Sequence, residues 1–128
     1  MKKYALIGLA AVGFVLAGAI STGVVHAQER KSVYVVIDVA EFTDEALYKT
    51  MLSKSDAVNT EFGAKAVVQA ANVTALDGAA PSRFIVLSFE SAEKANAWYN
   101  SQGEKEVTAI RRKASKSRAF VVDALPAK

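Results

Sequence analysis

Few side chains in this sequence are suited to acid–base or nucleophilic chemistry. There is one histidine, His26, and no cysteine. His26 falls in an N-terminal segment that we expect to be removed, so a Ser-His-Asp or Cys-His arrangement would lack its base. The acidic residues do not show the Asp-x-Asp spacing of a calcium loop, and a haem group would lack its usual histidine ligand. We therefore expect no metal and no cofactor.

An amide and two aromatic side chains, Asn96, Trp98 and Tyr99, form the first candidate site. On one helix they could line a cleft against a sheet and bind a small apolar or aromatic molecule. The alternative is structural, because a buried aromatic ring removes about 150–250 Å² from water and can anchor a helix by itself. The sequence leaves both interpretations open and identifies no catalytic residue.

The second candidate pairs Asp38 with Arg111. Asp38 lies on the same side of an apolar run as Tyr34 and Val36, so its carboxylate would be partly buried and in need of a partner. Arg111 follows Val107 by four residues and shares the inward side of a helix with it. We expect an Asp38–Arg111 pair in the cleft. The alternatives are a purely structural ion pair and two separate surface charges.

A basic run surrounds this arginine, with cations at Arg111, Arg112, Lys113, Lys116 and Arg118. It could attract an anionic ligand or an anionic membrane surface, although cations also suit the solvated end of a helix. Without the N-terminal segment and its two lysines, 14 basic and 13 acidic side chains remain, a net charge of +1. A nearly neutral domain is poorly suited to nucleic acid, so we expect no nucleic-acid partner.

The N-terminal segment, residues 1–27, has the three parts of a bacterial secretory signal peptide. Lys2 and Lys3 precede the uncharged apolar run Tyr4–Ile20, and Val25 and Ala27 are small residues at the two positions that a signal peptidase recognises. We expect cleavage after Ala27, a periplasmic or secreted protein, and no stable membrane anchor afterwards. The alternative is an uncleaved anchor helix.

The remaining chain shows alternating strand and helix patterns after a polar lead-in at residues 28–32. The predicted elements are a strand at Val33–Val39, a helix from Thr43 to Gly63, a strand at Lys65–Val73, a turn at Asp77-Gly78, a strand at Phe84–Phe89, a helix from Ser91 interrupted at Ser101–Gly103, and a strand at Ser117–Leu125. Residues 33–125 therefore form a single domain, followed by a tail at residues 126–128.

The predicted order is βαββαβ, which indicates an α+β, ferredoxin-like, four-stranded antiparallel sheet with its helices on one face. The first and third strands are the most apolar, so we place them in the centre of the sheet and the alternating second strand at an edge. Both central strands are apolar on both faces. Because the helices cover one face only, we expect a homodimer in which two sheets pack face to face.

The segment Phe89–Ser101, with Ser91, Ala95 and the pair Trp98-Tyr99, resembles the domain-of-unknown-function family 1330 of the dimeric α/β-barrel superfamily. Matching features elsewhere in residues 33–125 are the following: Tyr34-Val35-Val36, Asp38, Asp44, Tyr48, Asp77-Gly78, Arg83 and Arg111. The resemblance implies a dimeric α/β barrel and no established activity.

The leading interpretation is an exported homodimeric domain that has a cleft for a small apolar or aromatic organic ligand and no demonstrated catalysis. The first alternative is an enzyme similar to the cofactor-independent monooxygenases or isomerases of that superfamily, which would use groups such as Asn96, Trp98 and Tyr99. The second alternative is a purely structural or interaction dimer.

Overall fold

The computed structural model describes residues 31–126 of the chain. Four strands and four helices follow one another within that range: β1 (Val33–Phe42), α2 (Glu45–Thr50), α3 (Leu52–Glu61), β2 (Lys65–Ala70), β3 (Arg83–Phe89), α4 (Ala92–Tyr99), α5 (Gln102–Ala114) and β4 (Ser115–Asp123).

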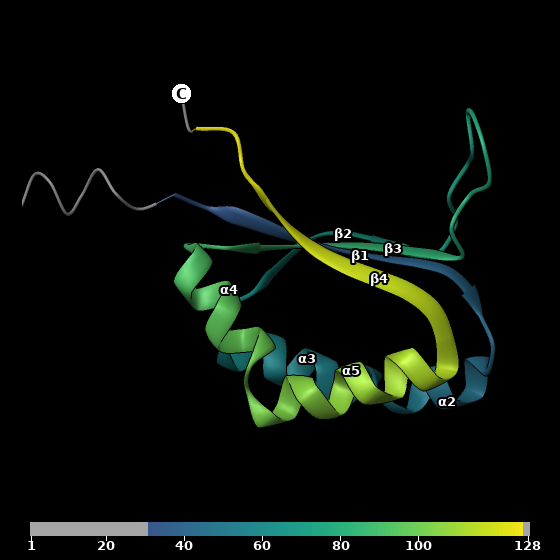
Figure 1. Cartoon of the computed structure of the whole chain (residues 1–128), viewed down its shortest axis with the longest axis horizontal. Coiled ribbons are helices and arrows are strands. Elements are labelled where there is room, and N and C mark those ends of the chain that lie inside the picture. The colour runs from purple at the N-terminus through teal and green to yellow at the C-terminus, as the bar shows by residue number, and fades with distance from the viewer. Residues whose placement is uncertain (1–30, 127–128) are drawn as a thin grey trace, which may run out of the picture. The chain divides into compact units, whose positions relative to one another are not determined.

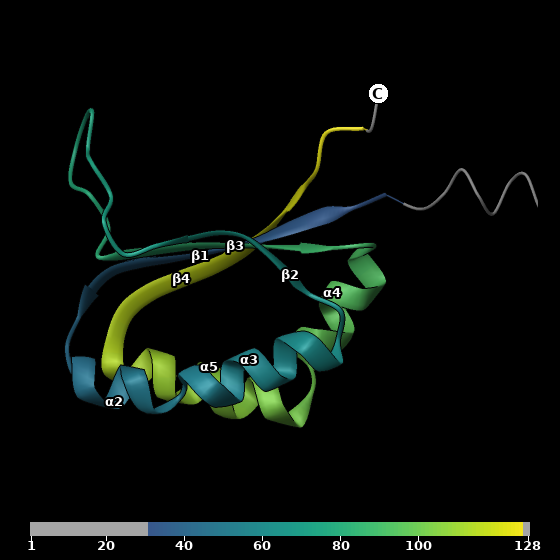
Figure 2. The same cartoon turned by 180° about the vertical axis from the view of Figure 1, so that it is seen from behind.

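The strands form one antiparallel sheet in the order β2-β3-β1-β4. The helices cover one face of this sheet (Figure 1), and α3 lies alongside α5 in both views (Figure 2). This arrangement is a ferredoxin-like α+β fold, as the sequence predicted. The first and third strands are central and the alternating second strand lies at an edge, so the predicted strand order is confirmed.

The first predicted helix is divided into α2 and α3 at Met51. Asp44 rather than Thr43 caps α2, because its Oδ1 accepts a hydrogen bond from the Leu47 amide at 3.0 Å. The Thr43 hydroxyl instead donates to the Lys113 carbonyl oxygen at 3.3 Å, which ties the helix entry to the end of α5. Gly63 follows α3 with a φ of 72°, a left-handed conformation that glycine adopts at low cost.

The second helical segment is interrupted as predicted. The Ser91 hydroxyl oxygen accepts from the Lys94 amide at 3.2 Å and caps α4. The Ser101 hydroxyl oxygen accepts from the Glu104 amide at 3.2 Å and caps α5. Two serine caps ten positions apart therefore start two separate helices.

Five strand boundaries differ from the prediction. β1 ends at Phe42 rather than Val39, β3 begins at Arg83 rather than Phe84, and β4 ends at Asp123 rather than Leu125. β4 begins at Ser115, directly after α5, because the last residues of β1 extend far enough to pair Phe42 with Ser115. β2 ends at Ala70 rather than Val73, and Ala70 faces Phe84 at the last pair of its ladder. The loop that follows rises from the sheet on the side away from the helices (Figures 1 and 2).

The core lies between the sheet and the helices. Its buried residues are Val33, Val35, Ile37, Val39, Tyr48, Met51, Val58, Leu87, Phe89, Ala95, Trp98, Val107 and Ala114. Every second residue of β1, from Val33 to Val39, is thus buried against the helices. Because side chains of paired residues point to the same face of a sheet, the pairing partners of these residues also lie on the helix-covered face.

The other face of the sheet is also apolar. Val36 lies opposite Val86 on one side and Phe120 on the other, so these three side chains share that face. Phe120 is 42% exposed and Val122 40% exposed. We call this the outer face.

The expected signal segment lies outside the described residues. Within residues 31–126 no helix is long and apolar enough to cross a bilayer.

Candidate functional site

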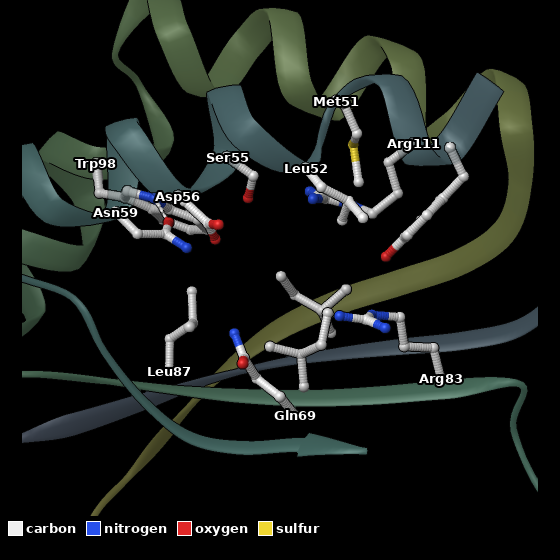
Figure 3. A pocket seen from close by; sticks show the side chains of 13 residues that line it. Met51, Leu52, Ser55, Asp56, Asn59, Gln69, Arg83, Leu87, Trp98 and Arg111 are labelled. Atoms are coloured by element: carbon white, nitrogen blue, oxygen red, sulfur yellow. Dashed lines mark hydrogen bonds between the residues drawn. The ribbon is translucent and has the colours of Figure 1, made fainter. Parts of the chain in front are cut away.

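A narrow cavity of about 30 Å³ lies between the sheet and the helix layer (Figure 3). Every helix and the strands β1, β2 and β3 contribute to its wall: Ile37, Tyr48, Met51, Leu52, Ser55, Asp56, Asn59, Gln69, Arg83, Ile85, Leu87, Trp98 and Arg111. A polar cavity of this size holds one or two water molecules. It is too small for an aromatic ring.

A larger groove of about 490 Å³ adjoins this cavity. It is lined by Phe42, Glu45, Tyr48, Lys49, Leu52, Ala71, Ser82 and Arg83. The groove and the cavity share Tyr48, Leu52 and Arg83. We call these three residues the junction, because they line both the open groove and the more enclosed cavity.

The fold positions both polar residues of the junction. Arg83 is the first residue of β3 and lies opposite Val39, so alternation places it on the helix-covered face with Ile85 and Leu87. Tyr48 lies on α2, where its ring packs edge-on against Phe42 with the centroids 4.8 Å apart.

Two polar atoms at the junction have no hydrogen-bond partner. Tyr48 is only 2% exposed. No group of the described chain meets hydrogen-bond distance and angle with its hydroxyl or with the buried Nε of Arg83. Among residues 31–126, no carboxylate lies within ion-pair distance of the Arg83 guanidinium. The junction therefore presents two donors and one positive charge that no group of the described chain satisfies.

Burial raises the pKa of the Tyr48 hydroxyl above its usual value of 10.0. The guanidinium groups of Arg83 and Arg111 oppose this rise, because a nearby positive charge favours the phenolate. Arg83 is thus close enough to act on the hydroxyl, although the two groups do not meet hydrogen-bond geometry. At neutral pH Tyr48 remains a phenol that can donate its proton in a hydrogen bond.

The positive charge of Arg111 is neutralised within the helix layer. Its Nη2 donates to Glu104 Oε2 at 3.2 Å and to the Thr108 hydroxyl oxygen at 3.1 Å. Glu104 is fully buried, and its Oε1 has no partner. Burial raises the pKa of this carboxyl, while the charge and hydrogen bond of Arg111 hold it down in part.

Trp98 and Asn59 close the other end of the cavity. The indole N–H of Trp98 donates to Asn59 Oδ1 at 2.9 Å, which joins α4 to α3. The indole ring also packs on Phe89, with the centroids 5.3 Å apart. Figure 3 shows Asp56, Asn59 and Trp98 at this end, with Arg83 reaching in from the sheet and Arg111 from the helix layer at the other end.

The predicted Asp38–Arg111 pair is wrong. Asp38 lies on β1 opposite Phe84 and Arg118, on the outer face, and its Oδ2 accepts from Arg118 Nε at 3.1 Å. Arg111 lies on the opposite side of the sheet and pairs with Glu104. The sequence correctly grouped Asp38 with Val36, but that group belongs to the face without helices.

The structure separates the other predicted site residues as well. Trp98 and Arg111 line the cavity, but Asn96 and Tyr99 do not. Tyr99 is 43% exposed, and its hydroxyl oxygen accepts from Arg112 at 3.4 Å on the surface. The Asn96 side chain is exposed, and the backbone carbonyl oxygen of Asn96 accepts a hydrogen bond from the Asn100 side-chain amide at 2.9 Å, at the C-terminal end of α4.

The basic run does not form one patch. Arg111 is buried with Glu104, while Lys116 pairs with Glu41 at 2.8 Å and Arg118 with Asp38. Arg112 is exposed and contacts Tyr99. Lys116 and Arg118 are two residues apart on β4 and share one face of the sheet, while the turn of α5 places Arg111 in the core and Arg112 on the surface.

Sequence reasoning did not select Tyr48, Arg83 or Asn59 as site residues. A signal for Arg83 was present, because it precedes Ile85 and Leu87 at the two-residue spacing of one strand face. A signal for Tyr48 was its place one turn before Leu52. Within residues 31–126, no group of three or more His, Cys, Asp or Glu side chains could hold a metal ion.

Solved structures with this fold belong to proteins of different descriptions. A protein of unknown function from Rhodopseudomonas palustris is 14% identical with a TM-score of 0.65, covering 84% of this chain and 94% of that one. The cofactor-independent oxygenase SnoaB from Streptomyces nogalater is 11% identical with a TM-score of 0.55, covering 76% and 96%. A dimeric protein of unknown function with a ferredoxin-like fold from Bacteroides fragilis is 6% identical with a TM-score of 0.52, covering 73% and 96%.

These identities establish a shared fold and nothing about activity. No curated protein sequence matches this chain. The sequence profile described as "Domain of unknown function (DUF1330)" matches residues 32–125, which include every strand and helix of the described fold. The chain therefore belongs to the DUF1330 family.

Proposed function

We propose that this chain is an exported, homodimeric domain that binds a small organic molecule in the groove beside the junction. One observation carries this proposal: two residues that line the open groove, Tyr48 and Arg83, each carry a buried donor, the hydroxyl and Nε, that has no hydrogen-bond partner among the described residues. Leaving a buried polar group unpaired costs about 1–3 kcal/mol, and native proteins keep few such groups. A ligand that brings an acceptor atom to the junction would satisfy both donors.

The size of the groove supports this function. Its volume of about 490 Å³ falls in the range of about 300–1,000 Å³ that is usual for small-molecule sites. Phe42, Leu52 and Ala71 supply apolar surface, and the polar lining residues include Tyr48 and Arg83 of the junction. A site with apolar walls and a few convergent polar atoms is typical of ligand binding.

The homodimer in this proposal uses the outer face. Phe84, Val86 and Phe120 would pack against the same residues of a second copy, so that the apolar surface is buried. The structurally similar protein from Bacteroides fragilis is dimeric, which is consistent with this arrangement. The cavity lies on the other side of the sheet, so face-to-face pairing leaves the helix-covered side free.

The experiment is native mass spectrometry of the full chain, expressed with its N-terminal segment and purified gently from the periplasm. The proposal expects a dimer of chains that begin at Gln28, with an added small mass that denaturing conditions release. A Leu52→Trp variant, which fills the junction, should lose that mass. Ser53→Trp, an exposed position on the same helix, should retain it. A bare dimer in all three proteins would favour a purely structural dimer, and a chain still starting at Met1 would contradict export.

A second candidate function is cofactor-independent oxygenation. The hydrogen-bonded Asn59 and Trp98 side chains on the cavity wall favour it, because an amide and an indole are groups that such chemistry could use. The test is uptake of dioxygen with a quinol probe. If the unmodified protein takes up dioxygen and the Trp98→Phe variant retains its fold but does not, the result would support an enzyme. If the unmodified protein takes up dioxygen no faster than the Leu52→Trp variant, oxygenation of that probe is excluded.

A further inference from the structure

We infer that the ligand of this site is a small organic monocarboxylate that binds with its carboxylate at the junction, between Arg83 and Tyr48, and its apolar body in the groove. This inference rests on the proposed function and specifies its ligand class. Neither the family nor the similar structures assign such a site.

The charge balance of the groove favours one negative charge. Arg111 is neutralised by Glu104, and Lys49 is neutralised by Glu45 at the mouth, with the two charged atoms 3.4 Å apart. Arg83 is the remaining cation of the groove and has no carboxylate partner among residues 31–126. Asp56 also lines the cavity, but it is exposed and lies at the Trp98 end, away from Arg83 (Figure 3).

The donors at the junction match a carboxylate in number and kind. A guanidinium donates through parallel N–H groups to a carboxylate, and such charge-assisted bonds are about twice as strong as neutral ones. The second carboxylate oxygen can accept from the Tyr48 hydroxyl, which is held in its neutral, donating form by burial. A cationic ligand would be repelled, and a phosphate dianion would find one uncompensated cation for two charges.

The volumes of the cavity and the groove determine the orientation of the ligand. The cavity behind the junction, about 30 Å³, admits no more than a few atoms. The groove in front of it, about 490 Å³, has room for a ring or a short alkyl chain beside Phe42, Leu52 and Ala71. The charged head must therefore stop at the junction while the apolar body stays in the groove.

The test compares acids with their neutral isosteres by titration calorimetry on the mature dimer. The probes are phenylacetate and hexanoate, against phenylacetamide and hexanamide. We expect the acids to bind about ten- to a hundredfold more tightly, the ratio that a charge-assisted hydrogen bond supplies. Inorganic phosphate serves as the anion without an apolar body and should bind at least about tenfold more weakly than either acid.

Four variants separate the junction from the rest of the surface. Arg83→Gln should reduce the preference for acid over amide to within about threefold, and Arg83→Lys should restore part of it, because a lysine keeps the charge without the forked geometry. Tyr48→Phe should weaken the acids about three- to tenfold by removing one donor. Lys94→Gln, at an exposed lysine of α4 that lines neither the cavity nor the groove, should change affinity by less than about threefold. Circular dichroism of each variant shows that the fold is retained.

The outcomes distinguish the two proposals. If acids and amides bind equally and Arg83→Gln has no effect, the inference that the ligand is a carboxylate is refuted, but the proposal of a small-molecule site stands. If phosphate binds as tightly as phenylacetate, the apolar body of the ligand contributes nothing to affinity, and the site is a simple anion site. If none of the acids or amides binds at millimolar concentration, both the inference and the proposed function fail.

Discussion

The buried pair Glu104–Arg111 allows a sharp test of how this core is held together. Replacing Arg111 with Met keeps most of the side-chain volume but removes the one cation that, among residues 31–126, lies within ion-pair distance of Glu104. Glu104 has 0% exposure, so its carboxylate cannot turn to water without displacing the core. Breaking a buried ion pair by removing one partner costs about 3–5 kcal/mol. That is a large part of the roughly 5–15 kcal/mol by which a small domain is stable.

The loss should depend on pH in a defined direction. Burial already raises the pKa of Glu104 in the folded protein, and removing Arg111 raises it further. The folded variant then holds a proton that the unfolded chain releases above its ordinary pKa near 4.5. Its stability therefore falls as pH rises through this window, by up to about 1.4 kcal/mol per pH unit. The deficit relative to the unmodified protein should be smaller at pH 5 than at pH 7.

Urea unfolding followed by circular dichroism at pH 5, 6 and 7 measures these differences. Arg112→Met is the matched control, because Arg112 is an exposed neighbour and should lose less than about 0.5 kcal/mol. The double variant Glu104→Leu/Arg111→Met should recover most of the stability, since an apolar pair can replace a buried ion pair. A single variant that loses less than about 1 kcal/mol, or a loss that is independent of pH, would refute the reasoning.

Three further predictions concern other parts of the fold. Without ligand, Arg83→Met should raise the free energy of unfolding by about 1 kcal/mol, because it removes an unpaired, half-buried cation; a clear loss in urea unfolding would show that Arg83 is structural. Phe120→Glu should convert the proposed dimer to a monomer in light scattering, since it puts a charge into the outer face; an unchanged dimer would place the interface elsewhere. Gly103→Ala should lower the melting temperature, at a cost of about 1–3 kcal/mol, because the added Cβ would lie 2.6 Å from Val58 Cγ2; an unchanged melting temperature would mean that Val58 moves freely.

The fold could be predicted from sequence because its strongest patterns agree with one another. The two most apolar runs became the central strands β1 and β3, and the alternating run became the edge strand β2. Ser91 marked the start of α4 correctly, and α5 begins at Gln102, inside the interruption predicted at Ser101–Gly103. Local capping, periodicity and sheet order all indicated the same topology, which is the condition under which such predictions are reliable.

The details that failed depend on tertiary contacts. Thr43 and Asp44 are both good caps, and the choice between them follows from the hydrogen bond of Thr43 to Lys113, which is distant in the chain. The break between α2 and α3 at Met51 has no glycine or proline to mark it, and we have no physical account of it from the sequence. Helix periodicity continues across the break, so the sequence pattern alone describes one helix.

The candidate site was harder to predict than the fold. A strand pattern states which residues share a face but not which face the helices cover, so Asp38 was assigned to the wrong side of the sheet. Arg83 was not selected because a single arginine at the start of a strand usually reaches solvent. Its unpaired Nε becomes apparent only when the neighbours of that atom are known.

Trp98 is the protein's one tryptophan, and this gives the cavity a built-in optical probe. The indole is buried at 2% exposure and donates its N–H to Asn59, so its emission should be blue-shifted and insensitive to added iodide or acrylamide. No second tryptophan contributes background, and a change in its intensity, lifetime or anisotropy reports on this one wall. Binding and unfolding can therefore be followed on the unmodified chain, without a label and at low concentration.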